Sequence, residues 1–205
     1  MSKAREIARH LLQIKAIKLS PQAPFTWASG IESPIYCDNR MILSYPSVRN
    51  DVKNALAESA KEFADFDVVA GVATAGIAHG MLLADALGKP FIYVRDKAKG
   101  HGRQNRIEGA APEGKRVLVV EDLISTGGSS LRAVAALREA GAEVIGCLAI
   151  FTYGFERAAK SFQEADVALR TLSNYEVMSE EALNSGYISE SDLDVLRDFR
   201  NRVGA

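Results

Sequence analysis

Short apolar strands alternate with amphipathic helical segments along this chain, and that alternation constrains its fold more than any other feature. The expected strands are 66–70, 90–95, 116–122 and 142–151, and the expected helices are 44–63, 77–87 and 128–141. Glycines separate these segments, and the helices carry apolar residues at near-helical spacing. Strands that alternate with helices in this way predict an α/β fold of parallel βαβ units, with helices on both faces of the sheet.

Composition limits the remaining possibilities. The 205 residues are 47% hydrophobic and 25% charged, with a net charge of −1, which is enough apolar material for one sizeable core. A charge this close to zero gives no general attraction to nucleic acid or membrane. The first residues read as an amphipathic helix without the apolar core of a signal peptide, and Cys37 and Cys147 lack metal-ligand spacing. A reduced, cytoplasmic protein is therefore expected.

The stretch VLVVEDLISTGGSS, from Val117 to Ser130, predicts a ligand site. A buried strand is expected to end on Glu121 and Asp122, and a helix opens after Ser-Thr-Gly-Gly. Ligands of open α/β sheets bind at the carboxyl ends of strands, and the unpaired amides of a helix N-terminus attract phosphate. Two carboxylates beside a phosphate make sense if the ligand also carries hydroxyl groups. The pattern therefore indicates a ribose 5-phosphate.

Each half of this stretch also has an ordinary interpretation. Gly-Gly-Ser at a helix start is often only a cap, and acids at a strand end are often solvated. Their adjacency favours a ligand site over both. The stretch lacks the lysine of a Walker P-loop, and no G-x-G-x-x-G occurs in the chain, which disfavours ATPases and dinucleotide dehydrogenases.

A long polar stretch follows the second expected strand. Residues 96–114 are too many for an ordinary connection, and they include several cations with glycines between them. Loops of this length inside a compact domain are usually functional or disordered.

Two signatures carry a resemblance to a known family. VLVVEDLISTGGSS resembles the phosphoribosyl-diphosphate (PRPP) motif of type I phosphoribosyltransferases. FTWASGIESPIYCDNR (25–40) and YVRDKAKGHG (93–102) resemble bacterial orotate phosphoribosyltransferases. The resemblance runs from about residue 25 to 151. It implies the type I fold, a central, mostly parallel sheet flanked by helices. It also implies one domain, with a core of about 45–172 and a hood of about 1–44 and 173–205.

The resemblance implies the reaction of orotate with PRPP, giving orotidine 5′-monophosphate and pyrophosphate. It implies catalytic roles for Lys99, His101 and Asp122, with Lys99 acting mainly on the chemical step. The implied PRPP-binding residues are Arg95, Lys99, His101, Glu121, Asp122, Leu123, Ile124, Ser125, Thr126, Gly127, Gly128 and Ser129. Within this set, Glu121 and Asp122 would bind the ribose hydroxyls. The implied orotate-binding residues are Ser125, Ser29 and Gly30.

The implied cofactor is Mg²⁺. Because no cluster of His, Cys and carboxylates shows metal-ligand spacing, the ion is expected to arrive with PRPP and to touch the protein mostly through water. The implied partner is a second copy of the chain, because the family's catalytic loop reaches into the neighbouring subunit's site. Neither a nucleic acid nor a membrane is an expected partner.

Some positions depart from the better-known enterobacterial pattern. Ala28 and Ala75 replace lysines, Asp96 replaces a basic residue, and Tyr153 or Thr152 stands where that pattern has an orotate-binding arginine. The chain resembles the shorter Gram-positive form of the family. The residues that hold the orotate carboxylate are left open, with Arg40 as a candidate beside Ser29 and Gly30.

Two other functions share the PRPP motif: a phosphoribosyltransferase for another base, and a regulator that senses PRPP without catalysis. The signature at 25–40 and the retained Lys99 and His101 favour the orotate enzyme. Trp27 is expected either to stack on a base or to anchor packing. His79 is expected to pack or cap a helix, and His10 to lie on the surface.

Overall fold

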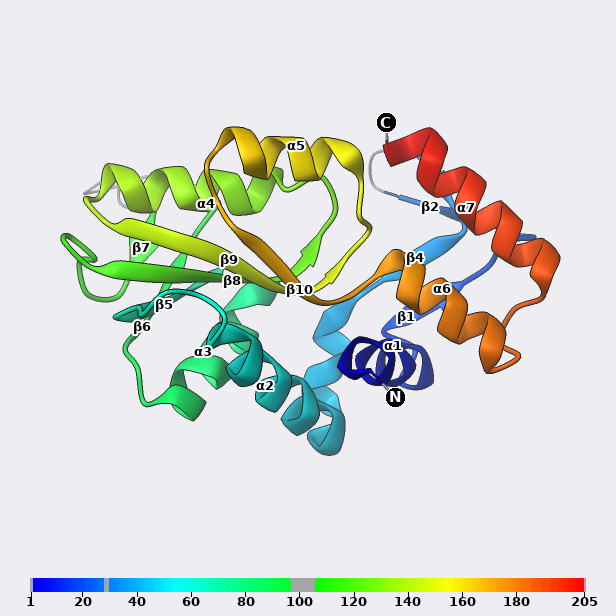
Figure 1. The fold of residues 1–205 in the computed structure, drawn as a ribbon, viewed down its shortest axis with the longest axis horizontal. Coiled ribbons are helices and arrows are strands. Elements are labelled where there is room, and N and C mark those ends of the chain that lie inside the picture. Colours follow the sequence, from blue (N-terminus) through cyan, green and yellow to red (C-terminus); the bar gives the residue numbers. More distant parts are fainter. Residues whose placement is uncertain (1, 28–29, 97–105, 205) are drawn as a thin grey trace.

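A six-stranded sheet forms the centre of the molecule (Figure 1). The computed structural model describes residues 2–27, 30–96 and 106–204. The strand order is β10-β9-β8-β5-β6-β7, and every pairing is parallel except that of β6 with β7. The strands are β5 (Val68–Val72), β6 (Phe91–Val94), β7 (Ile107–Glu108), β8 (Arg116–Ile124), β9 (Glu143–Thr152) and β10 (Leu169–Asn174). The predicted α/β class with a mostly parallel sheet is confirmed.

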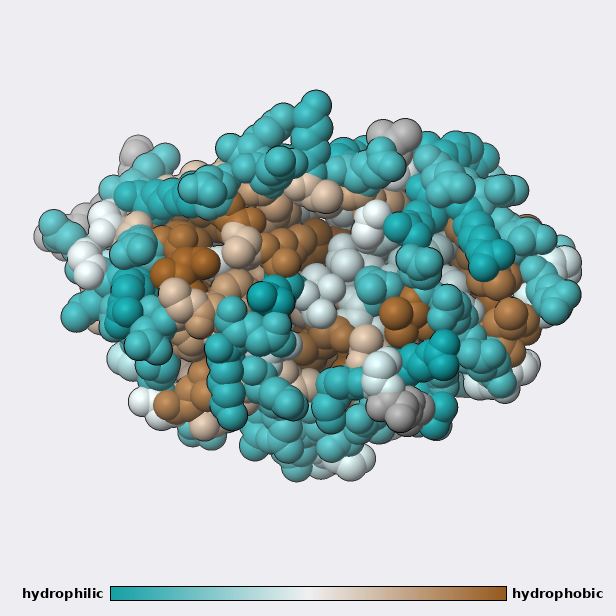
Figure 2. Space-filling view, in the orientation of Figure 1, coloured by the Kyte–Doolittle hydropathy of each residue, from teal (hydrophilic) through white to brown (hydrophobic). Residues whose placement is uncertain are grey.

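Helices cover both faces of this sheet. Figure 1 shows α4 (Gly128–Glu139) and α5 (Glu156–Glu164) on one face, and α2 (Pro46–Ala60) and α3 (Ala75–Leu87) on the other. The central strands are apolar and buried along almost their whole length, as expected for a sheet covered on both sides. Figure 2 shows hydrophobic residues between the two helical layers and hydrophilic residues over the helices.

The N-terminal and C-terminal segments of the chain both lie beside the carboxyl ends of the parallel strands (Figure 1). The N-terminal elements are α1 (Lys3–Gln13), β1 (Ile17–Leu19), β2 (Phe25–Thr26), β3 (Glu32–Ser33), β4 (Ile35–Cys37) and a 3₁₀ helix (Asn39–Ser44). The C-terminal elements are α6 (Tyr175–Asn184) and α7 (Glu190–Gly204). The strands β1 and β4 pair antiparallel, as do β2 and β3. None of the helices in the described ranges has the length and apolar character needed to cross a membrane.

Several elements differ from the sequence-based expectation. The strand expected to stop at Asp122 continues to Ile124, because β8 stays paired with β9 as far as Thr152. Helix α6, which the sequence analysis did not delimit, begins at Tyr175, where the Asn174 side chain accepts a hydrogen bond from the Val177 N–H. The sequence analysis did not predict β7, β10 or α5.

Helix α3 packs unusually close to β5, and glycines make this possible. A Cβ added to Gly71 would lie 2.8 Å from the Gly76 carbonyl oxygen and 2.9 Å from the Ile77 Cα. On the facing helix, a Cβ on Gly80 would lie 3.2 Å from the Gly71 Cα. The obstructing atoms are mostly backbone, so a side chain could be accommodated only by moving the helix away from the strand.

We therefore expect Gly71→Ala to lower the free energy of unfolding by about 1–3 kcal/mol, the usual cost of overpacking a filled interior. Urea unfolding followed by circular dichroism would measure the change. Gly128→Ala is the matched control, because the nearest atom to its added Cβ is the mobile Arg132 Nη1 at 3.4 Å. Equal stabilities of the two variants would contradict the close-packing explanation.

Candidate active site

The turn between β8 and α4 lies at the carboxyl edge of the sheet and contains the predicted phosphate-binding residues. Gly127 caps α4 with a φ of +80°, a conformation that favours glycine. A Cβ at this position would also lie 2.7 Å from the Phe162 ring. Thr126 and Ser129 are exposed, and Ser125 is half-buried. The turn therefore exposes the side chains of Thr126 and Ser129 to solvent, and its backbone conformation depends on the glycine at position 127.

The backbone amides of this turn are available to a ligand. Within the described part of the chain, no N–H from Ser125 to Ser130 donates a hydrogen bond, and the first bond of the helix runs from the Leu131 N–H to the Gly127 carbonyl. No side chain caps α4. Unpaired amides at the positive end of a helix dipole form an anion-binding site. This arrangement supports the phosphate cradle predicted from Ser125, Thr126, Gly127, Gly128 and Ser129.

Glu121 lies inside the protein rather than at the end of a strand. Its side chain accepts hydrogen bonds from the Asp122 N–H at 3.1 Å, the Ser130 hydroxyl at 3.3 Å and the Ser129 hydroxyl at 3.4 Å. The residue is only 5% exposed. Burial and the neighbouring Asp122 carboxylate raise the pKa of Glu121 well above its usual range. The expectation that both acids end the strand is wrong, because β8 continues past them.

Asp122 is more accessible than Glu121 and is held by a residue that the sequence analysis did not single out. The Asn39 Nδ2 donates a 2.7 Å hydrogen bond to the Asp122 carbonyl oxygen, and Asn39 is fully buried. His79, which is 1% exposed, packs beneath Asn39, and burial lowers its pKa to about 4, so it is neutral at physiological pH. Burial also raises the pKa of Asp122. His79 thus packs in the interior, which is one of the two roles expected for it from the sequence.

A pocket of about 240 Å³ lies beside the cradle and collects positive charge. Its lining includes Arg95, Arg106, Arg132, Ser129 and Ala73. The pocket thus brings two predicted residues, Arg95 and Ser129, to one place. The Ala73–Thr74 peptide in the adjoining turn is cis.

The arginines of this pocket are held by ion pairs. Arg95 pairs with Glu108 at 3.3 Å, and Arg132 pairs with Asp96 at 2.9 Å. The sequence analysis did not assign Arg132 to the site, and its side chain is 56% exposed. Its position one turn into α4, directly after the glycine-rich stretch, was the available signal.

The residues named for orotate are only partly assembled. Gly30 is exposed, with a φ of +83° and no atom within 4 Å of an added Cβ. Arg40 binds Asp38 through two hydrogen bonds, at 2.6 and 2.9 Å, and its side chain remains 60% exposed. Ser29, Lys99, His101 and Ala28 lie outside the described residues, so their predicted roles stay predictions.

Tyr153 belongs to an aromatic cluster between the sheet and the chain ends. Its ring stacks on Trp27 at 5.3 Å and on Phe155 at 5.5 Å, and it is 3% exposed. Trp27 also contacts Phe199 edge-on, and its Nε1 donates to the Ile35 carbonyl. These contacts match the packing-anchor interpretation of Trp27. The hydroxyl of Thr152 donates a hydrogen bond to the Ile124 carbonyl oxygen. Neither Thr152 nor Tyr153 can carry a positive charge, so neither supplies the charge that an arginine would bring.

Glu121 generates a prediction about pH. A carboxyl whose pKa is raised on folding stabilises the protein below its unfolded pKa of about 4.3, and this contribution is lost as the pH rises through the folded value. Glu121→Gln removes the titration and keeps the acceptor. We therefore expect the variant to gain stability over the parent as the pH rises above about 4.3, by up to about 1.4 kcal/mol per pH unit within that window.

Urea unfolding at a series of pH values measures this difference. Glu164→Gln is the control, because the Glu164 side chain is 66% exposed and its substitution should give no such trend. A pH-independent difference between Glu121→Gln and the parent would refute the buried-acid explanation.

Comparisons with known proteins agree with this geometry. A family model described as the phosphoribosyl transferase domain matches residues 38–184. The chain is 53% identical to an orotate phosphoribosyltransferase of Listeria innocua over 98% of this chain and 96% of that protein. It is 52% identical to the orotate phosphoribosyltransferase of Staphylococcus saprophyticus, over 98% of this chain and 99% of that protein.

A solved structure is similar as well. The crystal structure of orotate phosphoribosyltransferase from Aeropyrum pernix has a TM-score of 0.78 and 31% identity, and the match covers 89% of this chain and 99% of that one. The sequence similarity to Listeria and Staphylococcus proteins agrees with the predicted Gram-positive form.

Proposed function

The chain belongs to the orotate phosphoribosyltransferases, enzymes of pyrimidine biosynthesis in the type I phosphoribosyltransferase family, and from this premise we propose which residues perform the reaction. The proposed substrates are orotate and PRPP, and the products are orotidine 5′-monophosphate and pyrophosphate. The observation that carries the residue assignment is the run of unpaired amides from Ser125 to Ser130 beside a partly exposed carboxylate, Asp122.

The ribose 5-phosphate end of PRPP would occupy the turn before α4. Its phosphate accepts hydrogen bonds from the free amides of residues 125–130, with the hydroxyls of Ser125 and Thr126 close by. Asp122 accepts hydrogen bonds from the ribose hydroxyls. Glu121 positions the cradle rather than contacting the ribose directly. Its carboxyl accepts hydrogen bonds from the hydroxyls of Ser129 and Ser130 and so holds the first turn of α4 in place. Leu123 and Ile124 complete the strand that leads into the cradle.

The pyrophosphate end would occupy the cationic pocket. Arg95 and Arg132 can exchange their intramolecular carboxylate partners, Glu108 and Asp96, for phosphate oxygens. Lys99 and His101 are proposed to approach from the segment between Arg95 and Arg106. The reaction has an oxocarbenium-like transition state from which pyrophosphate departs, so cationic groups aimed at the leaving group stabilise the charge that develops there.

The proposed cofactor is Mg²⁺, and the donors at this site fit it. Mg²⁺ takes oxygen ligands and keeps several waters, and Asp122 is the more accessible of the two carboxylates at the cradle. When bound with PRPP, the ion would neutralise charge on the pyrophosphate. The protein's own contribution is to align the two substrates and exclude water from the reacting carbon, which are large effects in a displacement that needs little acid–base chemistry.

Orotate would lie between the cradle and the segment 25–40. Ser125, Ser29 and Gly30 are the proposed contacts, and Arg40 is the described cation best placed to take the orotate carboxylate. Its bidentate partner Asp38 shows that this guanidinium is oriented for a planar carboxylate. The Tyr153 hydroxyl makes no hydrogen bond within the described ranges, so it is available to donate to the base.

A homodimer is the proposed assembly, with the segment that contains Lys99 shared between subunits. The apolar side chains of Met41, Tyr45 and Met81 support it, because each is more than a third exposed on elements next to the site. The proposed domain organisation is a core of about 45–172 closed by a hood of about 1–44 and 173–205. We propose a cytoplasmic location and no nucleic-acid or membrane partner, in keeping with the near-neutral charge.

The assignment is tested by following the absorbance of orotate with the purified chain, PRPP and Mg²⁺. We expect orotate to be consumed only when all three are present, and uracil and purine bases to be left unchanged. Turnover of another base in place of orotate would overturn the proposed base specificity. Binding of PRPP without turnover of any base would overturn the catalytic assignment and favour a sensor.

Lys99→Ala should lower kcat by about 10²–10³, the usual effect of removing one group that stabilises transition-state charge. The KM for orotate should change little, because Lys99 is proposed to act on the leaving group. Lys97→Ala is the matched control, since it removes the same charge from the same segment. Equal effects of the two substitutions would mean that only net charge matters, and an unchanged kcat for Lys99→Ala would exclude the proposed role.

A further inference from the structure

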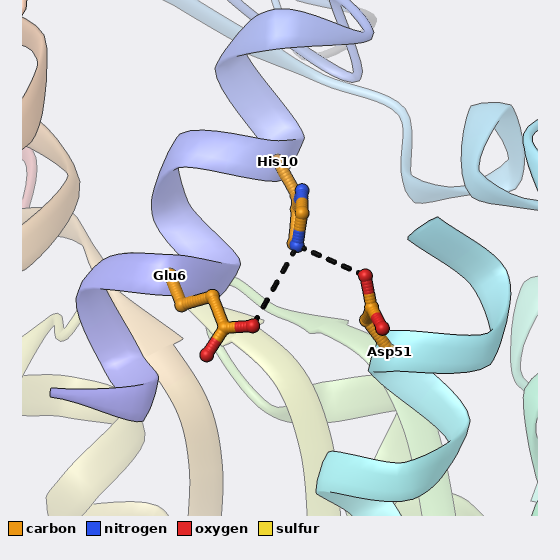
Figure 3. Close-up of side chains that lie close together, drawn as sticks. All are labelled: Glu6, His10 and Asp51. Carbon is orange, nitrogen blue, oxygen red and sulfur yellow. Dashed lines mark ion pairs between the residues drawn. The ribbon is translucent and has the colours of Figure 1, made fainter. Parts of the chain in front are cut away.

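Three side chains that could bind a metal ion meet between α1 and α2 (Figure 3). Glu6 and His10 lie one turn apart on α1, and Asp51 projects from α2. The His10 Nε2 lies 3.2 Å from the Asp51 Oδ2 and 4.0 Å from the Glu6 Oε1. One ligand atom from each residue lies within 4.8 Å of the others. The sequence did not reveal this group, because Asp51 is brought to the helical pair only by the packing of α1 on α2.

The orientation of the imidazole is the informative feature. The His10 Nε2 is buried, yet it makes no hydrogen bond to any described residue, although a carboxylate oxygen is 3.2 Å away. Figure 3 shows this nitrogen facing the space between the two carboxylates, with a carboxylate oxygen on either side. An ordinary histidine–carboxylate pair would direct one N–H along a single bond to oxygen. A ring nitrogen that faces a space bordered by two carboxylates is in the position of a metal ligand.

We propose that Glu6, His10 and Asp51 bind a divalent first-row transition cation of the Zn²⁺ class. Zn²⁺ takes nitrogen and carboxylate ligands at about 2.0–2.2 Å, which in a tetrahedron places neighbouring ligand atoms about 3.3 Å apart. The 3.2 Å between His10 and Asp51 already matches this value, whereas the Glu6 carboxylate, 4.0 Å from the His10 Nε2, must move inward to complete the site. The Glu6, His10 and Asp51 side chains are 37%, 21% and 43% exposed, so they have freedom to close and the fourth position can hold water.

The remaining contacts leave the ligand atoms free for this role. Glu6 uses its other oxygen, Oε2, to bind the Lys3 Nζ at 3.1 Å. The Asp51 side chain makes no hydrogen bond in the described part of the chain, and its 3.2 Å contact with His10 is an ion pair. An imidazole ligand favours Zn²⁺, Co²⁺ or Ni²⁺ over Mg²⁺, which prefers oxygen donors alone. The site is therefore chemically distinct from the one that would accept Mg²⁺ with PRPP.

The bound cation would connect the N-terminal helix α1 to α2, one of the helices that cover the central sheet. Helix α1 packs mainly on α6 and β10 and only lightly on α2. A metal ion bridging α1 and α2 would reinforce this light contact. It would also stabilise the folded chain, because an ion that binds only the native state shifts the unfolding equilibrium toward that state. Since the ligating imidazole must be neutral, binding weakens as the pH is lowered.

The test uses the full-length protein after treatment with a chelator. Zn²⁺ alone is titrated by calorimetry, and Co²⁺ alone by its visible d–d absorption, which reports nitrogen and oxygen ligation directly. We expect one equivalent to bind, and a 100-fold excess of Zn²⁺ over its Kd to raise Tm by about 5 °C or more. Mg²⁺ at the same concentration should raise Tm by less.

His10→Gln, Glu6→Gln and Asp51→Asn are nearly isosteric, and each should weaken Zn²⁺ binding at least about tenfold. The metal-free variants should keep the Tm of the metal-free parent within about 2 °C, which separates loss of a ligand from loss of folding. Glu58→Gln, an exposed acid on α2, and His101→Gln should retain the affinity of the parent.

Two results would overturn the proposal. One is the absence of stoichiometric Zn²⁺ binding to the parent. The other is an unchanged affinity in both His10→Gln and Asp51→Asn. Either would mean that the three side chains form only an ion-pair cluster.

Discussion

The parallel pairing of β8 with both β5 and β9 is the constraint on which the rest of the structure depends. Neighbouring parallel strands have their carboxyl ends at the same edge of the sheet. The connection between them must therefore run back over one face of the sheet to the opposite edge, and it usually contains a helix. The turn after β8, the turn after β5 and the end of β6 therefore converge without being neighbours in sequence. The unpaired amides before α4, Asp122 and Arg95 come together for this reason.

This edge combines two opposing electrostatic requirements. The unpaired amides of α4 attract an anion, while Glu121 and Asp122 would repel it if both were fully charged and exposed. The structure lowers this repulsion by burying Glu121, whose pKa is raised and whose Oε2 accepts hydrogen bonds from two serine hydroxyls. Asp122 is left as the accessible acceptor. A ligand that carries phosphate and hydroxyl groups side by side satisfies both halves of the site.

Local pattern was enough to predict the alternation of strands and helices and the cradle before α4. Both depend on residues adjacent in sequence, as in Ser125–Gly128. The extension of β8 and the additional strand β10 depend on pairing with β9, which no local pattern encodes. The start of α6 depends on the cap at Asn174, a local signal that the sequence analysis did not use.

Contacts across the chain were beyond sequence reasoning. Asn39 supports Asp122 across 83 positions, so its role is visible only after folding. The same holds for Asp51 and His10, which meet because two helices pack together. Arg132 is an intermediate case: its place next to the glycine-rich turn was visible, but its ion pair with Asp96 was not.

The aromatic cluster at the edge of the site has an optical consequence. Trp27 is the only tryptophan of the chain, and its indole stacks on Tyr153 at the end of β9 and meets Phe199 of α7. One fluorophore thus touches two segments that are distant from it in sequence and that meet it only in the folded molecule. Its emission is a built-in spectroscopic reporter of how the two ends of the chain are seated against the sheet.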